Sequence, residues 1–213
     1  MIVGGTDTNY DPVNARGSAF GKTNVVSQAV TVHGGIRTIS IKQLDEAIKS
    51  VIDGNMDALE ALLDGLPLRV FAHNVECVPR LDFIVRDRRA SFEQSLSVLR
   101  EARRLRPDIL IKSSIMVGLG ETDEEVSEAM RLLFDAGVEM LTLGQYLQPS
   151  DRHLPVDRFP EPEQFANWDS EAREIGFRAV ASGPLVRSSY RAGLLWDEAR
   201  GGAPVLLGGQ VQN

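Results

Sequence analysis

Hydrophobic and polar positions follow two different periods along most of the chain. Between residues 41 and 64 apolar side chains recur at helical spacing, which predicts two helices. Gly54 ends the first of these helices, and Asn55 can cap the second. After Gly65, apolar runs of strand length take turns with segments of helical period. The predicted strands are 68–76, 109–120, 139–148 and 177–183, and the predicted helices are 91–106, 122–136, 161–176 and 191–200.

This order of elements predicts the fold class. Strands and helices that alternate in series form parallel β/α units with right-handed crossovers, so we expect an α/β protein. Residues 1–39 differ, because they are rich in Gly, Asn, Thr and Val without a helical period. We read them as loop and edge strand, with a short strand at Val30–Val32.

Polar residues and glycines follow each of the four predicted strands. The carboxyl ends of parallel strands meet at one rim, where ligand sites form in such folds. One strand-end histidine is usually structural, but polar groups after four consecutive strands favour a ligand site. These residues are His73, Asn74 and Glu76; Gly118, Gly120 and Glu121; Gln145, Tyr146 and Gln148; and Ser182, Gly183, Arg187, Ser188, Ser189 and Tyr190.

The segment MVGLGETDEEV, residues 116–126, does not fit a phosphate-binding loop. Asp123 stands where a dinucleotide fingerprint has its third glycine, and four carboxylates crowd the start of the next helix. These charges repel phosphate and tolerate a positively charged ligand, such as an ammonium or a sulfonium group. Asp123, Glu124 and Glu125 fit better as a well-capped helix start, with a capping box from Thr122 to Glu125.

Composition excludes several classes of function. The net charge of −7 over 213 residues argues against general nucleic-acid binding. No apolar run approaches the ~20 residues of a membrane span, so we expect a soluble cytoplasmic protein without membrane contact. The segment from Arg80 to Arg106 contains eight arginines and four acidic residues. This excess of positive charge fits a solvated helix face or, alternatively, a docking surface for an acidic partner.

Cys77 is the only cysteine. A single cysteine excludes an internal disulfide and any four-cysteine metal or cluster site made by this chain alone. His73 lies four residues upstream, but no pair of oxyanion donors is evident nearby, so we interpret Cys77 as a packing residue.

Four motifs closely resemble the lipoyl synthase family: HNVECVPRL (73–81), KSSIMVGLGETDEEV (112–126), LTLGQYLQPSDRHLPVDRF (141–159) and GFRAVASGPLVRSSYRA (176–192). The resemblance implies a radical S-adenosylmethionine enzyme with a partial parallel β/α (TIM-like) barrel. That family inserts two sulfurs at C6 and C8 of an octanoyl group on a lipoyl-carrier domain, with two [4Fe-4S] clusters and S-adenosylmethionine.

The resemblance also implies domain boundaries. It covers the partial barrel at residues 54–200, which would be truncated at its N-terminal side. Before it stands an atypical segment, residues 1–53, partly irregular and with one helix. After it, we expect residues 201–213 to form a flexible tail.

Individual roles follow from the same motifs. The RSSY motif would supply a serine ligand to the auxiliary cluster, which we assign to Ser189, with Ser188 as the alternative; Arg187 would position that loop. Cys77 stands where the family usually has threonine. The residues implied to bind cofactor are His73, Asn74, Glu76, Lys112, Ser113, Gly118, Gly120, Glu121, Gln145, Gln148 and Arg187.

The chain departs from the family at its cysteines. The family carries two cysteine triplets for its clusters, and residues 1–53 contain no cysteine. A serine alone cannot hold an iron–sulfur cluster, so we expect no cluster binding and no sulfur insertion by this chain alone.

Two alternatives remain open from the sequence. One is a non-catalytic module that binds S-adenosylmethionine or an octanoylated carrier domain. The other is a barrel enzyme that uses acid–base chemistry at Glu76, Lys112 and His153. Separately, a barrel that lacks its first units exposes a strand edge, so we expect self-association unless residues 1–39 cover that edge.

Overall fold

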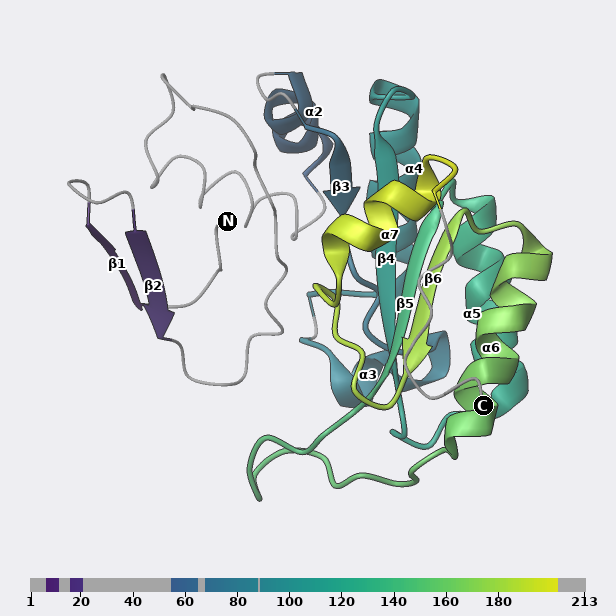
Figure 1. Cartoon of the computed structure of the whole chain (residues 1–213). Coiled ribbons are helices and arrows are strands. Elements are labelled where there is room, and N and C mark those ends of the chain that lie inside the picture. Colours follow the sequence, from purple (N-terminus) through teal and green to yellow (C-terminus); the bar gives the residue numbers. More distant parts are fainter. Residues whose placement is uncertain (1–6, 12–15, 21–54, 65–67, 88, 203–213) are drawn as a thin grey trace.

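A four-stranded parallel sheet forms the centre of the protein (Figure 1). The computed structural model describes residues 7–11, 16–20, 55–64, 68–87 and 89–202. The sheet order β3-β4-β5-β6 is also the order in the chain, and each neighbouring pair is parallel. The α/β prediction is therefore confirmed, and the arrangement agrees with a partial β/α barrel. The strands are β3 (Val70–Ala72), β4 (Leu110–Val117), β5 (Met140–Gln145) and β6 (Ala179–Gly183).

Helices connect the strands, and three of them begin at a side chain that caps the first turn. The Asn55 side chain accepts a hydrogen bond from the amide of Ala58 at 3.1 Å, and Thr122 and Glu125 form the predicted capping box. None of the described helices is long and apolar enough to cross a bilayer. The helices are α2 (Met56–Asp64), α3 (Asp82–Val85), α4 (Phe92–Leu105), α5 (Asp123–Asp135), α6 (Pro162–Ile175) and α7 (Ala192–Ala199), with a 3₁₀ turn, η1, at Pro79–Leu81.

The two faces of the sheet are covered differently. Ile111 and Ile115 of β4 point into the main core, which also contains the buried residues of α4, α5 and α6. Leu110 points to the opposite face and belongs to a smaller cluster with Leu195 of α7. Figure 1 shows α7 crossing this second face of the sheet. We call the two sides the helix face and the α7 face.

The amino-terminal part differs from the sequence prediction. Strands β1 (Asp7–Asp11) and β2 (Arg16–Phe20) form a separate antiparallel pair, whereas the sequence pattern predicted loop and edge strand over 1–39 and located its strand at 30–32. Their sequences, DTNYD and RGSAF, contain few β-branched or aromatic residues and therefore carry little strand signal. The predicted strand at 30–32 and the predicted helix before Gly54 lie outside the described residues.

Strand β3 is shorter than predicted. The sequence indicated a strand over 68–76, but ladder pairing covers only three residues and returns as a single bridge between Glu76 and Ile115. Glu76 has a φ of 71°, in the left-handed region, so the chain cannot continue as a regular strand. Pro79 then starts the 3₁₀ turn, which the sequence pattern did not reveal.

Candidate functional site

A buried ammonium group lies at the centre of the α7 face. Lys112 on β4 is 5% exposed, and its Nζ donates to Thr142 Oγ1 on β5 at 3.2 Å. The same Nζ donates to the backbone carbonyl of Ser188 at 2.7 Å. Burial lowers the pKa of Lys112 to about 8, and the carboxyl of Glu76 opposes this shift. One side chain therefore connects two strands to the RSSY segment.

Asn74 and Glu76 follow the end of β3 and complete this polar group. The amide of Glu76 donates to the Ser114 carbonyl at 3.2 Å, and its own carbonyl accepts from the Met116 amide at 2.7 Å. Both side chains are buried. Burial raises the pKa of the Glu76 carboxyl to about 7, against a hydrogen bond from Asn74 and the charges of Arg86 and Lys112.

The backbone of Glu76 is itself unusual. A non-glycine residue with a φ of 71° costs on the order of 1 kcal/mol and persists only where the surroundings enforce it. Such strained residues cluster at functional sites. Asn74, Glu76 and Lys112, which we predicted as site residues, are brought together here.

His73 and Ser113 point to the helix face instead. His73 Nε2 lies 3.2 Å from Ser95 Oγ of α4, and the guanidinium of Arg86 donates to the same hydroxyl at 2.9 Å. Burial and, to a smaller extent, the charge of Arg86 lower the pKa of His73 to about 4. Ser113 lies between Ile111 and Ile115 on β4, and its buried hydroxyl has no hydrogen-bond partner in the described structure. These two side chains do not join the group around Lys112.

The glycine turn after β4 is held by Glu121. Its two carboxylate oxygens accept from the amides of Gly118 at 2.7 Å and Leu119 at 2.9 Å. Gly118 and Gly120 have φ values of 97° and 104°, which favour glycine. A Cβ on Gly118 would lie 2.2 Å from Gln145 Nε2. In this structure the Glu121 carboxylate stabilises the turn.

The two predicted glutamines hold the loop after β5. Gln145 Nε2 donates to the carbonyl of Tyr146 at 2.9 Å and to that of Arg158 at 3.1 Å. Gln148 is exposed, and its Nε2 donates to the His153 carbonyl at 3.0 Å. Their amide groups therefore fix the path of the chain between residues 146 and 158.

The RSSY motif belongs to a segment, residues 184–191, that we call the strap. It lies against β5 on the α7 face, because a Cβ on Gly144 would come within 2.2 Å of the Val186 carbonyl oxygen. Arg187 donates to that carbonyl at 2.7 Å and to the Gln145 carbonyl at 3.4 Å. Ser188 is half-buried, whereas Ser189 is exposed.

Sequence reasoning missed Ser114 and Thr142. Both are buried, and both share the α7 face with Lys112. Thr142 is two residues from Met140 and from Gly144 on β5, so period-two counting from Met140 would have placed it on this face. The register that sets Lys112 opposite Met140 could not be read from the sequence.

The thiol of Cys77 is not available to a ligand. Its side chain belongs to the main core with no exposed surface, as the packing interpretation predicted. Its Sγ lies 3.9 Å from Asp82 Oδ1, and burial followed by the charge of Asp82 raises its pKa to about 12. Within the described ranges, no three His, Cys, Asp or Glu side chains come together in a way that could hold a metal ion.

Comparison with known proteins adds the family. Residues 1–133 match the model of the radical SAM superfamily. The chain belongs to this superfamily. It is 53% identical over 156 residues to the lipoyl synthase of Thermus thermophilus, which is 73% of this chain and 48% of that protein. It is 53% identical over 150 residues to the mitochondrial lipoyl synthase of Xenopus laevis, covering 70% of this chain and 40% of that protein.

A third relative, the lipoyl synthase of Halorhodospira halophila, is 49% identical over 172 residues, or 79% of this chain and 51% of that protein. The resemblance to lipoyl synthases is therefore confirmed, and this radical SAM protein is their homologue. It spans about half the length of the curated relatives it matches. The superfamily match includes residues 1–53, and the domain boundary at residue 54 stays a prediction.

Membership of the radical SAM superfamily implies an iron–sulfur cluster and S-adenosylmethionine. A cluster requires several thiolates, and the single thiol of this sequence is buried in the core. The residues present therefore do not fit a cluster. The carboxyl and amide groups of Glu76 and Asn74, at a strand end in a parallel sheet, are compatible with a cationic ligand such as S-adenosylmethionine.

Proposed function

We propose that this chain is the ligand-holding part of a lipoyl synthase. It binds S-adenosylmethionine at the carboxyl ends of the sheet and does not hold a cluster by itself. The observation that carries this proposal is the Lys112 ammonium, which joins β4 and β5 to the carbonyl of Ser188 in the strap. That contact brings the RSSY motif to the strand ends where Asn74 and Glu76 are also buried.

Glu76 and Asn74 would recognise the positive charge of the ligand. The Glu76 pKa of about 7 means that only part of this carboxyl is ionised near neutral pH. A bound sulfonium or ammonium group favours the ionised form and lowers that pKa. Gly118, Gly120, Glu121, Gln145 and Gln148 would shape the rim through the turn and loop that they hold.

Sulfur insertion on an octanoylated carrier domain would need thiolates in addition to Cys77. Ser189 is the better candidate for a ligand oxygen, because it is exposed whereas Ser188 is half-buried. Arg187 would stabilise the strap through its bonds to the Val186 and Gln145 carbonyls. This chain would then contribute a wall of the site, and the cluster ligands would come from other thiols.

The cation-binding part is tested by calorimetric titration with S-adenosylmethionine. The affinity should rise between pH 6 and pH 7.5, because Glu76 ionises over this interval and the ionised form attracts the ligand. Glu76→Gln should lower the affinity about tenfold and flatten its pH dependence. Glu128→Gln, an exposed change on α5, is the matched control and should leave both unchanged. Absence of saturable binding by the full chain would contradict the proposal.

The cluster part is tested by anaerobic reconstitution of the 213-residue chain with iron and sulfide. We expect no stoichiometric cluster, because Cys77 cannot leave the core without opening it. Iron and acid-labile sulfide are measured after desalting, with a cysteine-complete lipoyl synthase as the positive control. A stable stoichiometric cluster that releases 5′-deoxyadenosine under reductant would overturn this part and leave the ligand-binding part standing.

A further inference from the structure

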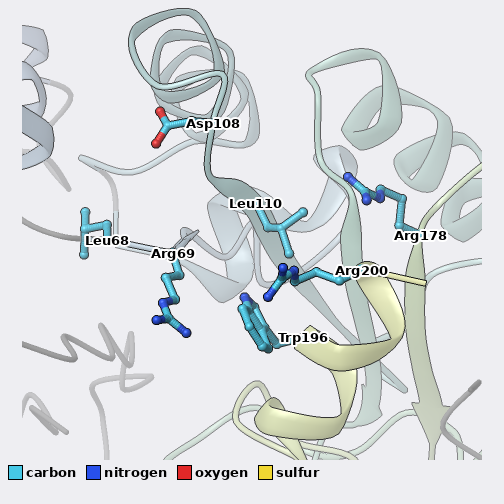
Figure 2. A pocket seen from close by; sticks show the side chains of 7 residues that line it. All are labelled: Leu68, Arg69, Asp108, Leu110, Arg178, Trp196 and Arg200. Atoms are coloured by element: carbon cyan, nitrogen blue, oxygen red, sulfur yellow. The ribbon is translucent and has the colours of Figure 1, made fainter. Parts of the chain in front are cut away.

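A cavity of about 470 Å³ lies at the amino ends of the strands, whereas Asn74 and Glu76 follow the carboxyl end of β3 (Figure 2). Arg69 precedes β3, Asp108 precedes β4 and Arg178 precedes β6, so the cavity faces the amino ends of the strands. Trp196 and Arg200, from α7 and its carboxyl end, complete the polar part of the lining. Two leucines, Leu68 and Leu110, provide the apolar part.

Two guanidinium groups share one indole in this cavity. The Arg200 guanidinium carbon lies 4.6 Å from the centre of a Trp196 ring, and that of Arg69 lies 5.4 Å from it. Figure 2 shows both side chains directed toward Trp196. In the part of the chain that the structure describes, no carboxylate forms an ion pair with either arginine.

The acidic groups around the cavity form ion pairs with arginines other than Arg69 and Arg200. Asp108 accepts two hydrogen bonds from Arg106, each 2.8 Å long. Glu139 accepts from Arg178 at 2.9 Å and also pairs with Arg103, so one carboxylate serves two guanidinium groups. The lining therefore has an excess of positive charge on a protein whose net charge is −7.

We propose that this cavity binds a phosphomonoester, with the phosphate between Arg69 and Arg200 and an organic group against Trp196 and the two leucines. The two guanidinium groups carry like charges beside one ring, and a doubly charged oxyanion bound by both would offset their repulsion. Guanidinium groups bind phosphate through paired N–H donors, which suits this role. The volume is in the range of small-molecule sites, so it leaves room beside a phosphate for the organic group.

The position of the cavity separates it from the proposed S-adenosylmethionine site. Asn74 and Glu76 follow β3, whereas Arg69 comes before it. The two arginines are also far apart in sequence and meet only through the packing of α7 on the sheet. The cavity thus depends on the folded chain but not on Glu76 or Lys112, and its test can succeed or fail independently of the proposed function.

The test is calorimetric titration of the full chain with adenosine monophosphate, inorganic phosphate and adenosine at low ionic strength. We expect adenosine monophosphate to bind most tightly, inorganic phosphate more weakly and adenosine not measurably. Arg69→Gln and Arg200→Gln should each weaken adenosine monophosphate binding about tenfold. Trp196→Leu should weaken adenosine monophosphate more than inorganic phosphate, because only the former has a ring to place on the indole.

Arg131→Gln on α5, which removes an exposed arginine paired with Glu171, is the matched control and should leave binding unchanged. Arg69 and Arg200 are both exposed, so their variants should stay folded, which circular dichroism and thermal unfolding check. The proposal would be overturned if neither adenosine monophosphate nor inorganic phosphate gave a saturable binding isotherm. Equal binding of adenosine and adenosine monophosphate, or an equal loss in the Arg131 control, would also overturn it.

Discussion

At the scale of single residues, burial changes the proton affinity of neighbouring groups in opposite ways. His73 and Glu76 are three residues apart, and both are almost fully buried. Burial favours the neutral form of each, so the pKa of His73 falls to about 4 while that of Glu76 rises to about 7. His73 therefore acts as a neutral hydrogen-bonding group under α4, and Glu76 remains able to change charge near neutral pH.

The free energy of unfolding should record the burial of His73. Below pH 6.5 the unfolded chain binds a proton on this imidazole that the folded chain accepts only near pH 4. The stability contribution of His73 therefore falls as the pH drops from 6.5 to 4, by on the order of 3 kcal/mol. Urea unfolding at several pH values, compared between the wild type and His73→Gln, measures this contribution.

Glu76 has the opposite effect, because its folded pKa lies above its unfolded value. Its stabilising contribution is present below pH 4.5 and is lost as the pH rises toward 7. Wild type and His73→Gln share the contribution of Glu76. The difference between their free energies of unfolding as a function of pH therefore isolates the contribution of His73. Parallel curves for wild type and variant would show that the imidazole is not held neutral.

At the scale of elements, the strap is held against the sheet by one buried side chain. Gly144 allows the Val186 carbonyl to approach β5, and the Lys112 ammonium binds the next turn at Ser188. Substitution of Lys112 should therefore affect the strap more than the sheet. A buried charge also carries a desolvation cost, which limits its net effect on global stability.

Lys112→Met should raise amide hydrogen exchange in residues 184–191 about tenfold, because the Ser188 carbonyl loses its donor. The global free energy of unfolding should change by less than about 1 kcal/mol. Exchange is measured by mass spectrometry on peptides from the strap and from α5. Thr142→Val is the matched control, since it removes the second acceptor of Lys112 and leaves the strap bond in place. Unchanged strap exchange in Lys112→Met would refute this role.

The elements themselves were predictable where periodicity and capping agree. Helix α5 has apolar positions at helical spacing and a Thr122–Glu125 capping box, and it forms as predicted. The α7 face was harder to predict, because it depends on the register that sets Lys112 opposite Met140. The positive φ of Glu76 was not predictable either, since nothing in the type of residue indicates it. His73 and Ser113, which the motifs assign to the cofactor, lie on the helix face, and their role stays a prediction.

At the scale of the whole molecule, the two ends of the sheet have different chemistry. Glu76 follows the end of β3 and Lys112 lies beside that end on β4, and the pKa values of both lie near neutrality. The amino ends carry Arg69, Arg178 and Arg200 around an indole. Strand β3 is the outermost strand of the described sheet, so one side of its backbone has no neighbour within that sheet.

Removal of residues 1–39 should cause self-association if those residues cover the edge at β3. An uncovered strand edge offers unpaired backbone groups to a second chain. Size-exclusion chromatography with light scattering compares the full chain with the shortened one over a range of concentrations. A stable, monodisperse monomer of the shortened chain would contradict this expectation.

The buried thiol of Cys77 is a built-in probe of how often the core opens. Cys77 has no exposed surface, and its raised pKa keeps it in the unreactive protonated form. Alkylating reagents can modify it only when the packing around β3 and α3 separates. The rate of modification in native buffer, followed by intact mass, therefore reports how often that region opens, without any engineered label.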